Sequence, residues 1–117
     1  MTRKSTEEIA MMRRAGALVA RTLVAVETAS AVGVAVSELD DLAHRLIEEA
    51  GARPTFLHYL PRFAPTPYPA ALCVSVNDVI VHGIPRGRRL ADGDLVSIDL
   101  AAHVDGWCAD AARSYIV

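Results

Sequence analysis

The fold is decided by the run Leu95-Val96-Ser97-Ile98-Asp99-Leu100-Ala101-Ala102-His103-Val104 and by the run Trp107-Cys108-Ala109-Asp110-Ala111-Ala112-Arg113-Ser114-Tyr115-Ile116-Val117. Both runs have the composition of β-strands, and the dipeptide Asp105-Gly106 between them is typical of a two-residue hairpin turn. Each run also carries one aspartate, Asp99 in the first and Asp110 in the second. Aspartate is uncommon in strands, so this pair is the most informative feature of the chain.

A two-residue turn fixes the register of the predicted hairpin. With Val104 opposite Trp107, Ala101 lies opposite Asp110. Asp99 and Asp110 are then diagonal neighbours on one face, with backbones roughly 7–8 Å apart. Carboxylates leaning inward from these positions could bridge two metal ions, which lie about 3.5–4 Å apart in such sites. Spacing alone leaves a second interpretation open, in which the aspartates are surface residues on the wet face of a sheet. A register slip or bulge would even place them on opposite faces.

The two faces of the hairpin differ in composition. The aspartate face carries mainly small and polar side chains, which leave room for ions and a substrate: Leu95, Ser97, Asp99, Ala101, His103, Cys108, Asp110, Ala112, Ser114 and Ile116. The opposite face is apolar except for Arg113, and it is predicted to belong to the core: Val96, Ile98, Leu100, Ala102, Val104, Trp107, Ala109, Ala111 and Tyr115.

Two helices are predicted upstream of the hairpin. Ser5 opens a capping-box pattern, and helical periodicity continues from there to about Ser30. A second helix is predicted to start near Ser37 and Asp40, and Gly51 is placed to end it.

The segment between the second helix and the hairpin is less regular. Residues 53–69 are rich in proline and predict an irregular loop. Residues 71–76 and 79–82 read as strands separated by Asn77-Asp78, and residues 86–94 as a turn region. Helices followed by an antiparallel sheet predict an α+β fold with the helices packed on one face of the sheet.

Charge and composition exclude several functional classes. The net charge of −2 gives no electrostatic footprint for nucleic-acid binding. The basic stretch 86–89 is interpreted as a solvated turn, with a contact to the ribosome as the alternative. No run approaches the roughly 18 apolar residues of a membrane span, so no membrane association is expected.

The expected compartment is the cytoplasm. Residues 2–8 lack the apolar stretch of a signal peptide. The two cysteines are too few for a disulfide framework, which fits a reducing cytosol.

Three ordered motifs carry a family resemblance. Residues 94–99, preceded by Asp92-Gly93, and residues 106–115 resemble the two metal-ligand strands of type I methionine aminopeptidases. Residues 73–85, which include the sequence His-Gly-Ile-Pro, resemble the signature segment of that family. The resemblance extends from about Ile9 to Val117.

The resemblance implies a fold and an activity. It places residues 1–117 as the N-terminal half of the pita-bread (creatinase/aminopeptidase) fold. The implied function is metal-dependent removal of the initiator methionine from nascent proteins, by a metal-activated hydroxide at a dinuclear site. The cofactors would be two divalent ions, Co, Mn, Fe or Zn, and the substrates would be peptides that begin with methionine.

The resemblance also assigns roles to individual residues. Asp99 and Asp110 match two metal ligands, of which Asp110 would bridge both ions and Asp99 would hold mainly one. His82 matches the histidine that contacts the substrate and stabilises the tetrahedral intermediate. Three residues fall where the family lines the pocket for the methionine side chain: Tyr59, Tyr68 and Cys73.

Among the departures of the chain from the family, two bear most directly on the site and its activity. Residues 63–67 resemble an insertion beside the substrate pocket. The family completes its metal site with a histidine and two glutamates from its second half, which have no counterpart here, so this chain alone is expected to be inactive. Two alternatives remain: a related dinuclear peptidase of the proline dipeptidase type, or a non-catalytic half-domain that binds a peptide or protein partner.

Overall fold

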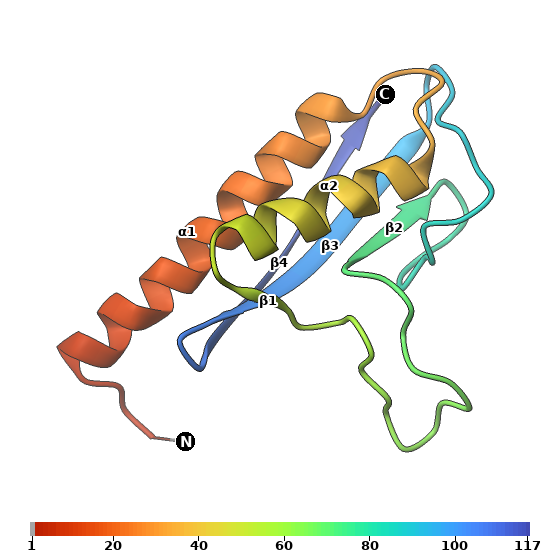
Figure 1. The fold of residues 1–117 in the computed structure, drawn as a ribbon. Coiled ribbons are helices and arrows are strands. Elements are labelled where there is room, and N and C mark those ends of the chain that lie inside the picture. Colours follow the sequence, from red (N-terminus) through yellow and green to blue (C-terminus); the bar gives the residue numbers. More distant parts are fainter. Residues whose placement is uncertain (1) are drawn as a thin grey trace.

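The computed structural model describes residues 2–117. Its elements, in chain order, are α1 (Thr6–Ala29), α2 (Val36–Glu49), β1 (Arg53–Pro54), β2 (Leu72–Val76), β3 (Leu95–Val104) and β4 (Trp107–Ile116). Both helices lie over the same face of the sheet, with α1 packed on β3 and β4 and α2 on β1 and β2 (Figure 1). The predicted α+β fold with helices on one face is therefore confirmed.

Strand β3 is the centre of the sheet. It pairs with β4 along its whole length, while β1 and β2 pair with different parts of β3, and all these pairings are antiparallel. Because β4 occupies one edge of β3, the strands β1 and β2 share the other edge. The central strand thus brings residues from four parts of the chain together.

The hairpin has the predicted register. Val104 pairs with Trp107, and Ala101 pairs with Asp110. The turn residues Asp105 and Gly106 both have positive φ values, +49° and +82°. Two positive φ values are the requirement of a type I′ turn, whose twist matches the twist of the strands it joins.

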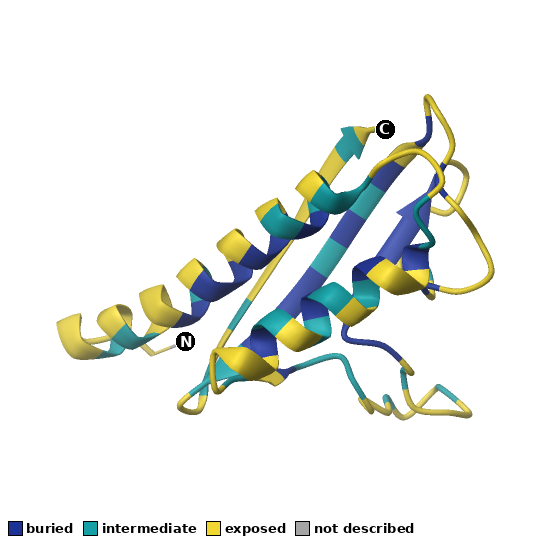
Figure 2. Cartoon of the chain, turned by 45° about the horizontal axis from the view of Figure 1, so that its top comes forward, coloured by how far each residue is buried: buried dark blue, intermediate teal, exposed yellow. Residues whose placement is uncertain are grey.

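The residues of β3 and β4 differ in how deeply they are buried (Figure 2). The core side of β3 is fully enclosed by the helices: Val96, Ile98, Leu100 and Ala102. In β4, Ala109 and Tyr115 are half-buried against this core, but Ala111 is exposed. The prediction of a core position at Ala111 is wrong because β4 lies at the edge of the sheet, where α1 covers it only partly.

The first helix begins as predicted. The Ser5 hydroxyl accepts a hydrogen bond from the Glu8 N–H (3.2 Å), and the Glu8 carboxylate accepts one from the Ser5 N–H (2.7 Å). This reciprocal pair is a capping box, and it satisfies two backbone donors at the helix start.

The second helix begins one residue earlier than the predicted Ser37. Its first residue is Val36, and the Glu38 carboxylate accepts from the Ala35 N–H (3.3 Å). The Val36 N–H donates to the Arg88 carbonyl (3.0 Å), so a contact distant in sequence sets the helix start. Gly51, with φ +70°, follows the helix as predicted.

Asp40 lies inside the second helix, and its side chain contacts the segment before β2. One oxygen of its carboxylate accepts the N–H groups of Ala71 (2.9 Å) and Leu72 (2.8 Å). Burial raises the pKa of this carboxyl, and the two backbone hydrogen bonds oppose that shift. Asp40 therefore anchors the end of the proline-rich segment and the start of β2 to α2.

Two other sequence predictions are wrong. Residues 79–82 form no strand; they are exposed, and the backbone turns at Asn77 and His82, which both have φ +57°. Conversely, the segment 53–69 is not irregular throughout, because β1 pairs with His103 and Ala102 of β3. A two-residue strand that contains a proline has no periodicity to detect.

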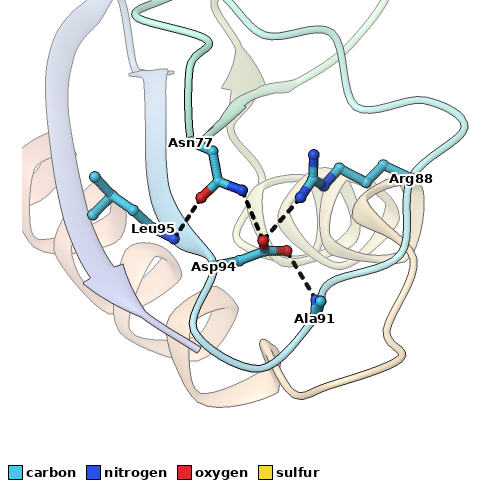
Figure 3. Close-up of polar contacts among 5 residues, drawn as sticks. All are labelled: Asn77, Arg88, Ala91, Asp94 and Leu95. Atoms are coloured by element: carbon cyan, nitrogen blue, oxygen red, sulfur yellow. Dashed lines mark hydrogen bonds and ion pairs between the residues drawn. The ribbon is translucent and has the colours of Figure 1, made fainter.

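A buried carboxylate organises the entry to β3 (Figure 3). Asp94 is 6% exposed, and it accepts hydrogen bonds from the Asn77 amide, the Arg88 guanidinium and the Ala91 N–H, all 2.8 Å long. These contacts, led by the Ala91 bond, lower the pKa of Asp94. Asn77 in turn accepts from the Leu95 N–H (3.0 Å). The network ties the turn after β2 to the first residue of β3.

In residues 2–117, no helix has the length and apolar character needed to cross a membrane.

Candidate metal and substrate site

One cavity of about 500 Å³ collects every site residue that the sequence predicted: Tyr59, Tyr68, Cys73, His82, Asp99 and Asp110. These residues come from the proline-rich loop, from β2, from the segment after β2, and from both strands of the hairpin. Their convergence does not itself test the roles that the resemblance assigns to them. It shows that these residues line one common cavity.

Asp99 has an unusual environment. It pairs with Cys73 of β2 and with Ala112 of β4, and its Oδ1 atom is buried with no hydrogen-bond partner. Burial, and then the negative charge of Asp110, raise the pKa of Asp99, while His82 opposes the shift. A buried carboxylate oxygen without a partner is costly unless a cation or donor meets it. The site therefore fits a metal ion.

Asp110 is the second carboxylate of the cavity. It lies on the edge strand β4, exposed, on the face shared with Asp99. Within residues 2–117, no group of three or more His, Cys, Asp or Glu side chains is arranged to hold a metal ion. The described part of the chain thus contributes two acidic ligands at most to any such centre.

His82 borders the cavity from the segment after β2. It is exposed and has a positive φ of +57°, which is uncommon for a residue with a side chain. The neighbouring Gly83 is held against β2: its carbonyl accepts from the Val74 N–H (2.9 Å), and its N–H donates to the Ser75 hydroxyl (3.1 Å).

Tyr68 and Cys73 form part of the cavity wall. The Tyr68 hydroxyl donates to the carbonyl groups of Leu72 (3.2 Å) and Gly83 (3.1 Å), and its ring meets Phe56 edge-on with centroids 6.4 Å apart. Burial raises the pKa of both the Tyr68 hydroxyl and the Cys73 thiol. Both groups are therefore neutral near pH 7, which suits an apolar lining and not a thiolate nucleophile.

The proline-rich loop supplies more of the cavity than the sequence indicated. The predicted insertion, residues 63–67, contributes Phe63, Ala64, Thr66 and Pro67 to the lining. Phe63 is 91% exposed, which is extreme for an aromatic ring. Sequence reasoning missed Phe56 and Ile84, which also border the cavity. Phe56 stands in no periodic pattern, and Ile84 belongs to the His-Gly-Ile-Pro sequence but was given no role in the pocket.

Comparisons with known proteins identify the family of the chain. Residues 10–117 match the model of metallopeptidase family M24, and the chain belongs to that family. Family membership implies a divalent metal cofactor.

Within the family, the chain is similar to methionine aminopeptidases. The chain is 46% identical over 113 residues to methionine aminopeptidase 1 of Mycobacterium tuberculosis, covering 96% of this chain and 40% of that one. It superposes on the methionine aminopeptidase of Rickettsia prowazekii with a TM-score of 0.88 and 36% identity, covering 99% of this chain and 45% of that one. The predicted pita-bread fold is thus confirmed, and the chain spans less than half the length of these relatives.

A prolidase also shares the fold. The prolidase of Pyrococcus horikoshii superposes with a TM-score of 0.78, but the two sequences are only 22% identical. That likeness concerns the fold alone. The sequence similarity therefore favours the methionine aminopeptidases over the proline dipeptidase alternative.

Proposed function

We propose that this chain is part of a metallo-aminopeptidase that removes the N-terminal methionine from nascent proteins. The observation that carries the proposal is the single cavity in which Asp99, Asp110 and His82 meet an apolar wall. It occurs in a chain whose relatives are named methionine aminopeptidases.

Asp99 and Asp110 would hold the metal. Carboxylates are hard oxygen ligands, and such ligands suit Mn, Fe, Co or Zn. The partnerless Oδ1 of Asp99 supports this assignment, because a cation would satisfy it. We infer that Asp99 and Asp110 would together contribute to the binding of two ions. When bound, the metal lowers the pKa of a water molecule and polarises the scissile carbonyl.

His82 and the apolar wall would handle the substrate. An imidazole N–H aimed at the developing oxyanion stabilises charge chiefly in the transition state. Tyr59 and Tyr68 offer aromatic surface to a flexible thioether side chain, which packs well against rings. The chain would thus bind the first residue of the peptide and orient its carbonyl.

The proposed setting is the cytoplasm, where nascent chains emerge from the ribosome. In the basic stretch 86–89, two arginines are engaged within the chain: Arg88 contacts Asp94 (2.8 Å) and Arg89 contacts Glu38 (3.5 Å). These contacts favour a structural role for that stretch over a ribosome contact.

A cleavage screen of the full-length protein tests the proposed activity. Supplied in turn with Mn, Fe, Co or Zn, it should cleave Met-Ala-Ser and leave Ala-Pro intact. Cleavage of Ala-Pro only would assign it to the prolidase type. Stoichiometric metal binding without hydrolysis would identify a binding module instead.

The role of His82 requires a matched control. His82→Ala should lower kcat by about 100-fold, the scale seen when an oxyanion donor is removed. His44→Ala should not, because His44 lies on α2 and contacts Glu48 (3.2 Å), outside the cavity. Equal activity of both variants would contradict the assignment.

A further inference from the structure

We propose that Ser75 is a positioning residue, whose buried hydroxyl fixes the backbone beside His82 and thereby aims the imidazole at the substrate. The inference rests on the proposed function, because it concerns how that site is oriented. Ser75 does not border the cavity and would not touch the substrate.

His82 needs an external restraint. It lies at the end of an exposed segment outside any strand or helix, and its φ of +57° is one that side-chain-bearing residues rarely adopt. Such a conformation persists where the surroundings determine it, and it concentrates at functional sites. The restraint must come from residue contacts nearby in space.

Gly83 supplies the attachment point. A Cβ atom there would lie 2.1 Å from the Val74 carbonyl oxygen and 2.9 Å from the Ser75 Cα, distances that no real Cβ contact shows. The chain can approach β2 this closely only because residue 83 is a glycine. The loop that carries His82 is therefore seated directly on the β2 backbone.

Three hydrogen bonds hold Gly83 in place. Its carbonyl accepts from the Val74 N–H (2.9 Å) and from the Tyr68 hydroxyl (3.1 Å). Its N–H donates to the Ser75 hydroxyl (3.1 Å). Of these three bonds, only the bond to Ser75 involves the Gly83 N–H, which belongs to the peptide bond between His82 and Gly83.

Ser75 is well suited to this task. It is 4% exposed, and it is the fourth residue of the five-residue strand β2, all of whose residues are buried. Strand β2 pairs with β3 from Leu72 to Val76, so the Ser75 backbone is fixed relative to Asp99. A hydroxyl at this position transmits the sheet geometry to the His82 loop.

The first test follows the Gly83 amide, and it needs no activity. In the full-length protein, hydrogen exchange at Gly83 should be slow in the wild type and in Ser75→Thr, and fast in Ser75→Ala. Ser30→Ala serves as the control, because Ser30 also loses a hydroxyl hydrogen bond (2.6 Å to Tyr115) but lies away from the cavity. Unchanged exchange in Ser75→Ala would overturn the proposal.

The second test is a double-mutant cycle on kcat for Met-Ala-Ser. Ser75→Ala should lower kcat about 10- to 100-fold, the cost of a small misplacement at a reacting centre, with KM and metal content unchanged. Ser75→Thr should restore most of the loss. In a His82→Ala background, Ser75→Ala should change kcat by no more than about twofold, because the two residues act as one unit.

The outcomes separate this inference from the proposed function. Equal losses from Ser75→Ala in both backgrounds would overturn the positioning role while leaving methionine removal intact. A wild-type protein that cleaves no methionine peptide would overturn the proposed function, and the Gly83 exchange test would still decide whether the hydroxyl holds the loop.

Discussion

The β3–β4 hairpin and the proline-rich loop line the same cavity, but they are built differently. The hairpin is held by a ladder in which ten residues of β3 pair with ten of β4. The loop is closed near its ends by two backbone bonds, His58 N–H to the Tyr68 carbonyl (2.9 Å) and Tyr68 N–H to the Tyr59 carbonyl (2.8 Å). Between them the chain carries Phe63 into solvent.

This difference suggests a division of labour. The proposed chemistry requires two carboxylates at a fixed separation, and the antiparallel ladder holds Asp99 and Asp110 in register. Recognition of a side chain tolerates more variation, and the loop, as is common for binding segments, provides that on a rigid scaffold. We therefore expect the proline-rich loop to tolerate changes in sequence that leave the positions of Asp99 and Asp110 unchanged.

The largest effect is expected from the hairpin. Asp110→Asn in the full-length protein should lower turnover by at least about 100-fold, because it removes a proposed metal ligand from the site. The measurement is kcat together with bound metal.

Asp105→Asn provides the matched control in the same hairpin. Asp105 lies in the turn, where asparagine also tolerates positive φ, and its ion pair with Arg14 (3.1 Å) is exposed. Activity should stay close to wild type. If both variants kept their metal and their activity, the hairpin would not be the metal site.

The next effect concerns the anchor where the loop meets β2. Asp40→Ala should destabilise the protein by about 2–4 kcal/mol, because the buried N–H groups of Ala71 and Leu72 lose their acceptor. Asp40→Asn keeps an acceptor oxygen and should cost less than about 1 kcal/mol. Urea unfolding measures both, and equal losses would show that charge, not hydrogen bonding, provides the anchor.

The pH dependence of stability should have opposite signs at two carboxylates. Asp94 has a lowered pKa, so its stabilisation is complete above its ordinary value of 3.8 and is lost as the pH falls through the lowered pKa. Asp40 has a raised pKa, so its contribution is present below 3.8 and declines as the pH rises through the raised value.

Unfolding of the wild type, Asp94→Asn and Asp40→Asn between pH 3 and pH 7 separates these contributions. The wild type should lose stability relative to Asp94→Asn on acidification, and relative to Asp40→Asn as the pH rises. Differences that do not vary with pH would contradict both assignments.

The smallest effect is expected in the loop. Phe63→Ala should change the free energy of unfolding by less than about 0.5 kcal/mol, because the ring is 91% exposed. It should nevertheless alter the discrimination between methionine and norleucine or leucine at the first position by about tenfold or less. Ile80→Ala is the control, since Ile80 is 88% exposed and outside the cavity. Identical selectivity of the two variants would exclude the loop from recognition.

The contrast between the hairpin and the proline-rich loop also explains which features the sequence could predict. Asp105-Gly106 specifies a turn type, the turn specifies the register, and the register places Asp99 and Asp110 on one face. Each of these steps is local. The capping box at Ser5 is local as well, and its prediction was confirmed.

The missed features depend on contacts distant in sequence. Strand β1 exists only because β3 offers an edge at His103. The start of α2 is set by the Arg88 carbonyl, and the path of residues 79–82 by the fit of Gly83 against β2. The family resemblance indicated which residues gather at the site. It did not indicate how the proline-rich loop lines the cavity or how Ser75 contacts the segment that carries His82.

The most direct test of the central claim is the number of metal ions bound per protein molecule, measured by native mass spectrometry of the full-length protein. The wild type should bind two ions, Asp99→Asn should lose mainly one, and Asp110→Asn should lose both. Two bound ions in all three proteins would contradict the assignment of these aspartates as the metal ligands.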